Sequence, residues 1–127
     1  MGTSAEDLYK QAGLFSMIGG ILGLVVGSLL SLYYGLLGIS TFGIGCVCCL
    51  HSILILAVGG AQLYYGLKVK NGEAVPNIKN MSLYLMIGSF VSFHVIGGIL
   101  ELLAYMNYGK PEVDAYIKAN APQITGG

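Results

Sequence analysis

The sequence predicts an all-α membrane protein with three transmembrane helices and a short C-terminal surface helix. The expected bounds of these four helices are about 12–36, 41–67, 81–107 and 111–119. Residues 11–67 include no Asp, Glu, Lys or Arg, and within residues 80–109 the only charged side chain is that of Glu101. A helix crosses a bilayer core of about 30 Å with roughly 20 apolar residues. The first stretch therefore holds two crossings and the second holds one, in a single domain.

Composition narrows the class of function. The net charge is zero and all six basic residues are lysines. Arginine is the usual partner for carboxylate or phosphate groups, so neither nucleic acid nor a phosphorylated ligand is expected as a partner. The sequence contains no glycine-rich phosphate loop after a strand and no assembled Ser/His/Asp set. We therefore expect a protein that is not an enzyme, with the lipid bilayer as its first partner.

The first helix carries small residues at every fourth position. It is expected to begin at a capping box formed by Thr3 and Glu6. The packing seam that follows consists of Gly19, Gly23, Gly27, Ser31 and Gly35. Such seams let helix backbones approach closely in lipid, where no hydrophobic effect drives association. The seam is expected to receive either another helix of the same chain or a helix of another subunit.

Lysines and tyrosines predict the orientation. The loop at 68–79 holds three lysines and one glutamate, whereas the turn between the first two spans holds no charge. Under the positive-inside rule, the N-terminus and the 68–79 loop lie on the cytoplasmic side and the C-terminus lies outside. Tyrosines gather at the expected span boundaries, as membrane interfaces favour. They are Tyr33, Tyr34, Tyr64, Tyr65, Tyr84, Tyr105 and Tyr108.

Residues 44–51 and 87–94 share the pattern Ile-Gly-small-x-x-small-x-His, and the register continues to Gly66 and Gly109. The second and third spans are therefore expected to be similar helices. Three cysteines stand in the first stretch where Ser89, Val91 and Ser92 stand in the second. This exchange favours small packing side chains over a haem or zinc motif. The three are Cys46, Cys48 and Cys49.

His51 and His94 end the shared pattern and are expected within about 3 Å of the same membrane depth. Gln62 and Glu101 lie on the same helical faces as these histidines, and polar groups inside a bilayer suggest function. Three alternatives follow. Each histidine donates a hydrogen bond to a neighbouring helix, or the pair are axial ligands of a b-type haem, or His94 and Glu101 form a proton relay. Glu101 is otherwise expected to reach headgroup water.

The function expected from these features is that of a small non-enzymatic integral membrane subunit, packed through Gly/Ser-rich helix faces into a homo-oligomer or a larger membrane complex. The first alternative is an electron-transfer subunit with a b-type haem on His51 and His94. A second alternative is a filament or pore-forming subunit. In layout only, the apolar helices around a short lysine loop resemble conjugation-type pilins.

Overall fold

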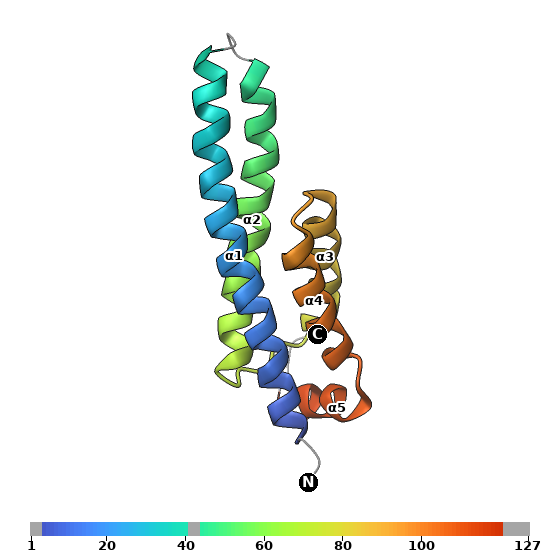
Figure 1. The fold of residues 1–127 in the computed structure, drawn as a ribbon. Helices are drawn as coiled ribbons and strands as arrows, with labels where there is room; N and C mark the ends of the chain where they lie inside the picture. The colour runs from blue at the N-terminus through green and yellow to red at the C-terminus, as the bar shows by residue number, and fades with distance from the viewer. Residues whose placement is uncertain (1–3, 41–43, 121–127) are drawn as a thin grey trace, which may run out of the picture.

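The computed structural model describes residues 4–40 and 44–120, which form helices and no strand. α1 and α2 make a long antiparallel hairpin, α3 and α4 make a shorter hairpin beside half of its length, and α5 lies across the end where α1 begins (Figure 1). The helices are α1 (Ala5–Ser40), α2 (Ile44–Lys70), α3 (Ile78–Val91), α4 (Val95–Tyr108) and α5 (Pro111–Asn120). The expectation of an all-α fold is confirmed.

Among the described residues, two segments are long and apolar enough to cross a membrane, Ala5–Ser40 and Cys49–Lys70. The 36 residues of α1 extend over about 54 Å. The expected cap, Thr3, lies outside the described residues, and Ser4 caps the helix. The Ser4 hydroxyl accepts a hydrogen bond from the Asp7 N–H at 3.1 Å and donates one to the Asp7 carboxylate at 2.7 Å. A polar start of this kind lets α1 begin outside an apolar environment.

The expectation of one continuous helix over 81–107 is wrong. The chain reverses direction between Val91 and Val95, and the segment becomes α3 and α4 (Figure 1). Each of these helices has 14 residues and is about 21 Å long. A bilayer core of about 30 Å exceeds that length. The third expected span is therefore a pair of half-length helices.

The reversal is a helix end closed by backbone hydrogen bonds. Phe93 has φ 60, in the left-handed region where glycine is the usual residue. The His94 N–H donates to the Ser89 carbonyl oxygen at 2.8 Å, and the Phe93 N–H donates to the Phe90 carbonyl oxygen at 3.1 Å. These two bonds satisfy carbonyl groups that the end of α3 would otherwise leave free.

The helix expected near 111–119 is present as α5, but its place in the fold differs from the expected one. Val113 and Ile117 of α5 are buried with Tyr9 of α1 in one apolar cluster. The rings of Tyr9 and Tyr116 lie 5.4 Å apart between centroids. Because the α3–α4 hairpin returns the chain to its starting level, α5 packs beside the first turns of α1 rather than at the far end of the bundle.

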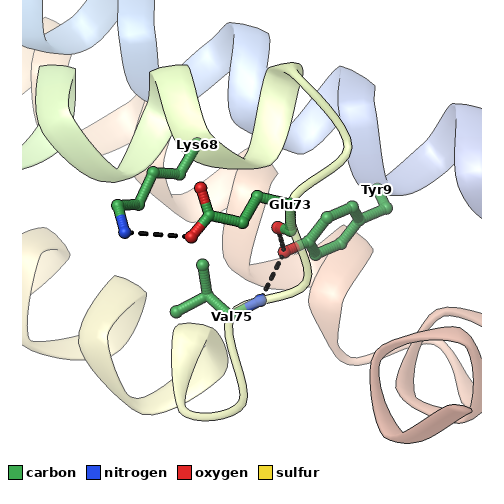
Figure 2. A network of polar contacts seen from close by, with 4 residues as sticks. All are labelled: Tyr9, Lys68, Glu73 and Val75. Carbon is green, nitrogen blue, oxygen red and sulfur yellow. Dashed lines mark hydrogen bonds and ion pairs between the residues drawn. The ribbon is translucent and has the colours of Figure 1, made fainter. Parts of the chain in front are cut away.

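Tyr9 also fixes the connection between α2 and α3. Its hydroxyl donates to the Glu73 carbonyl oxygen at 2.6 Å and accepts from the Val75 N–H at 3.0 Å. Figure 2 shows this network together with the ion pair between Lys68 and the Glu73 carboxylate, 3.0 Å long. A single tyrosine thus ties the loop, α1 and α5 together at this end of the molecule.

This end of the molecule, which we call the charged end, contains every charged side chain except that of Glu101. The members are Glu6, Asp7, Lys10, Lys68, Lys70, Glu73, Lys79, Lys110, Glu112, Asp114 and Lys118. The opposite end, where α1 and α2 meet, has no charged residue in its sequence. The fold is therefore strongly asymmetric along its long axis.

Candidate functional site

The most polar region of the interior is a cluster around Glu101 of α4, which is 1 % exposed. Its carboxyl group contacts one side chain from each of the three other long elements. The Oε2 atom lies 2.7 Å from Ser16 Oγ of α1 and 3.0 Å from Gln62 Nε2 of α2. The Oε1 atom lies 2.5 Å from Ser82 Oγ of α3. One carboxyl group of α4 therefore joins α1, α2 and α3.

Gln62 holds a defined orientation within this cluster and is fully buried. Its Nε2 atom donates to Glu101 and also to the Gly97 carbonyl oxygen at 3.3 Å. Because both neighbours of this atom are hydrogen-bond acceptors, the atom is the amide nitrogen, which has two hydrogens to donate. The other amide atom, Oε1, is buried and has no hydrogen-bond partner among the described residues. Gln62 thus binds the carboxyl group with one atom and leaves an acceptor free.

Close approach of α1 and α2 brings Ser16 and Gln62 together. A Cβ atom on Gly20 would lie 2.6 Å from the Gly59 carbonyl oxygen, and one on Gly66 would lie 2.8 Å from the Gly13 carbonyl oxygen. Such distances are incompatible with any side chain at those positions. Glycines at seven-residue spacing therefore bring the two backbones into contact on both sides of the cluster.

The expected packing seam is used mainly inside the chain. Gly19 faces Gly97 of α4, where a Cβ atom would lie 3.5 Å from the Gly97 carbonyl oxygen, and Gly27 faces Leu56 of α2. Gly23 lies between Gly59 of α2 and the His94 ring, and the Ser31 hydroxyl donates to Ser52 Oγ at 3.0 Å. Gly35 differs, because a Cβ atom there would meet no atom within 4 Å among those that the structure describes, which exclude the side chains of residues 41–48.

The two histidines flank the reversal between α3 and α4. The Nε2 atom of His51 lies 2.5 Å from the Ser92 carbonyl oxygen, and the Nε2 atom of His94 lies 3.4 Å from the Gly19 carbonyl oxygen. A carbonyl oxygen only accepts, so each Nε2 carries the ring proton. This is the geometry of the hydrogen-bonding alternative, with each histidine bound to a backbone oxygen of a different segment.

The expectation that Glu101 reaches headgroup water is wrong. A continuous helix would separate Ser82 from Glu101 by about 28 Å. The reversal instead brings Ser82 Oγ within hydrogen-bond distance of the Glu101 carboxyl group. Sequence reasoning identified Gln62 and Glu101 and missed Ser16 and Ser82. Small polar residues inside apolar helices were the available signal for both.

No group of three or more His, Cys, Asp or Glu side chains that could hold a metal ion occurs within residues 4–40 and 44–120. The side chains of Cys46 and Cys48 fall outside what the structure describes, and Cys49 has a free thiol. The chemistry of the described interior is therefore that of a carboxyl group, an amide, hydroxyls and imidazoles.

Comparison of the chain with models of protein families, with curated proteins and with solved structures finds no match. The fold and the cluster alone define the class. This is an all-helical protein with two helices long enough and apolar enough to cross a membrane, and with a half-length helical hairpin that holds a buried carboxyl group against them.

Proposed function

We propose that the protein is a small non-enzymatic integral membrane subunit. In this proposal α1 and α2 span the bilayer, and the α3–α4 hairpin enters and leaves it from one side. The observation that carries the proposal is the half-length hairpin, which covers only part of the α1–α2 pair (Figure 1). At and beyond its turn, which contacts His51, large apolar side chains point outward: Leu32, Leu36 and Leu50 are 67 to 68 % exposed. An apolar surface of this extent is stable in lipid or against another subunit.

The charge distribution supports an orientation with the charged end in the cytoplasm. All six lysines lie at that end, including Lys110 and Lys118 of the returning chain. Lysine-rich ends of membrane helices remain on the cytoplasmic side. A continuous third span would have placed Lys110 and Lys118 on the other side of the membrane from the remaining lysines. With the hairpin, all six lysines lie on one side, and the excess of positive charge there is larger. The 68–79 loop, the start of α1 and α5 all share the cytoplasmic side in this proposal.

Gly35 supports assembly with other subunits, either copies of the same chain or other membrane proteins. Of the glycines in the seam it is the one at which a Cβ atom would meet no described atom within 4 Å. Gly35 is half-buried, and a partly open glycine on a helix in lipid permits the backbone of another helix to approach. The proposed contact therefore lies on α1 beyond the reach of the α3–α4 hairpin.

The test is the mass of the purified protein in mild detergent, measured by light scattering, for the wild type and for Gly35→Leu. We expect the wild type to be larger than its chain mass of 13.3 kDa, and Gly35→Leu to be smaller than the wild type with unchanged thermal stability. Leu29→Ala on the same exposed surface is the matched control and should keep the mass of the wild type. A monomeric wild type would refute self-assembly, and an unchanged mass for Gly35→Leu would refute the contact at Gly35.

A further inference from the structure

The two serines at Glu101 each have a second acceptor within reach. Ser16 Oγ lies 2.7 Å from Glu101 Oε2 and 3.3 Å from the Gln62 carbonyl oxygen. Ser82 Oγ lies 2.5 Å from Glu101 Oε1 and 3.4 Å from the backbone carbonyl oxygen of Glu101 itself. A hydroxyl group has one hydrogen and can also accept. Each serine can therefore direct its hydrogen either to the carboxyl group or to a backbone carbonyl.

This arrangement satisfies both charge states of the carboxyl group. When Glu101 is ionised, the two serine hydroxyls and the Gln62 amide all donate to it. When Glu101 carries a proton, its O–H donates to one serine oxygen, and that serine turns its hydrogen to the backbone carbonyl. The second serine and Gln62 keep their bonds. Neither state leaves a buried donor of the cluster unpaired, so the change of state does not incur the usual cost of an unmet hydrogen bond.

We propose that Glu101 is a reversible proton-binding site built into the α3–α4 hairpin. The ligand is one proton, which adds to a carboxylate oxygen to give the neutral acid and leaves by the reverse step. No electron moves and no other bond changes. The inference goes beyond the proposed role as a membrane subunit and does not depend on whether the chain assembles with copies of itself.

The side chains that contact Glu101 carry no positive charge, so a bound proton is what can neutralise its carboxylate. α1, α2 and α3 present Ser16, Gln62 and Ser82, all of them neutral, and among the described residues no ion pair reaches Glu101. On its own helix the titratable residues are Tyr105 and Tyr108, and His94 stands at the N-cap. An ionised carboxyl group in an apolar interior is costly without a counter-charge. A proton supplies that charge and requires no further ligand.

Two unpartnered polar atoms beside the cluster indicate how a proton reaches it. Gln62 Oε1 is an acceptor on the amide that binds Glu101, and the Tyr108 hydroxyl lies two helical turns along α4 toward the charged end. Both are buried and have no hydrogen-bond partner among the described residues. Tyr108 packs edge-on to Tyr9, with ring centroids 6.0 Å apart, and Tyr9 belongs to the charged end. The proton route that we infer therefore runs from the charged end past Tyr108 to Glu101.

Infrared difference spectroscopy of the purified protein tests the proposal directly. The chain has four glutamates, and changing Glu6, Glu73 and Glu112 to Gln leaves Glu101 as the only one. With ¹³C-labelled glutamate in this variant, we expect one carboxylic acid C=O band that grows at acid pH, vanishes at alkaline pH and shifts with the isotope. Glu101→Gln in the same background should remove the band. The proposal would be overturned if the band kept the same intensity at every pH at which the protein stays folded, or if no band appeared at any of them.

The serines and the nature of the ligand are tested in the same titration. Ser16→Ala with Ser82→Ala removes both hydroxyls, and we expect the midpoint to move by at least tenfold in proton concentration. Ser4→Ala, at the start of α1, is the matched control and should leave the midpoint unchanged. An unmoved midpoint in the double variant would contradict the switching role of the hydroxyls. If adding Na⁺ at fixed pH removed the acid band and adding K⁺ did not, the ligand would be an alkali cation. That result would overturn the assignment of the ligand as a proton.

Discussion

Two stretches of this chain share a sequence pattern and fold differently. Residues 44–66 run through His51 as part of the unbroken helix α2, whereas residues 87–109 reverse direction just before His94. The reversal contains no glycine or proline to mark it. The difference lies after the histidine, where the first stretch has Leu54 and Ile55 and the second has Gly97 and Gly98.

These two glycines make room for the hairpin. A Cβ atom on Gly97 would collide with the His94 ring, and one on Gly98 would lie 2.9 Å from the Phe90 ring of α3. Larger side chains at these positions would push α4 away from α3 and from the turn. The comparison shows that a hairpin in an apolar segment can be determined by small residues that follow the turn, even where the turn itself carries an aromatic residue.

The same comparison explains why the two stretches differ in polarity. Val58 and Glu101 occupy corresponding positions, each seven residues after the shared histidine. Val58 packs toward α3, where a Cβ atom on Gly88 would lie 3.0 Å from Val58 Cγ2. Glu101 instead faces the interior and binds three helices. At this position the first stretch therefore supplies an apolar contact and the second supplies the carboxyl group, to which Gln62 of the first stretch donates.

The largest expected loss of stability comes from replacing the two glycines of the second stretch by the residues at the corresponding positions of the first. Gly97→Leu and Gly98→Ile should each destabilise the protein by about 1 to 3 kcal/mol through overpacking, as measured by unfolding in detergent. Gly60→Leu in α2 is the control, because a Cβ atom there meets nothing within 4 Å. Equal stability of Gly60→Leu and the two hairpin variants would show that the glycines do not create the hairpin.

The next effect concerns the polar centre. Glu101→Val gives the second stretch the side chain found at Val58. Both serines can then donate to backbone carbonyl oxygens, but one hydrogen of the Gln62 amide loses its acceptor. Unmet buried donors cost about 1 to 3 kcal/mol, whereas Glu101→Gln should cost less because its oxygen still accepts. Glu112→Gln, on the exposed face of α5, should change nothing. If Glu101→Val unfolds no more readily than Glu112→Gln, the cluster is not a stabilising contact.

The smallest effect is a change in stability on substitution by glycine, which should have opposite signs at two matched positions. Phe93 and Leu50 each precede the shared histidine and are 81 % and 68 % exposed. Phe93 has a left-handed backbone, which costs an L-residue roughly 1 to 2 kcal/mol. Phe93→Gly should therefore stabilise by up to about 1 kcal/mol, whereas Leu50→Gly in the middle of α2 should destabilise by about 1 kcal/mol. Thermal unfolding of both variants compares them, and a loss of stability in both would place a continuous helix at residue 93.

Much of the fold could be predicted from the sequence, and the hairpin could not. The absence of charges predicted long apolar helices, and Pro111 with its following acidic residues predicted α5. The break at residues 92–94 was missed because Phe93 is a poor indicator of a left-handed turn. Gly97 and Gly98 were visible, but a glycine pair inside an apolar helix has several uses, including room for a ligand.

Two of the four residues of the site were predicted, and the other two were missed because their contact depends on the reversal. Gln62 and Glu101 are rare polar groups in apolar stretches, so they were identified directly. Ser16 and Ser82 are common residues whose role depends on the reversal, since Ser82 and Glu101 meet only if the chain folds back. The place of α5 in the fold was missed together with the break, because a chain that folds back returns to the level at which it started.

The central claim is that the third apolar segment enters and leaves on one side. Single cysteines at Asn71 and Ala119, both exposed at the charged end, can be placed in a chain in which the three native cysteines are changed to serine. In sealed vesicles, an impermeant thiol reagent should label both positions from the same side. Labelling of Asn71 from one side and Ala119 from the other would require a continuous third span and would contradict the hairpin.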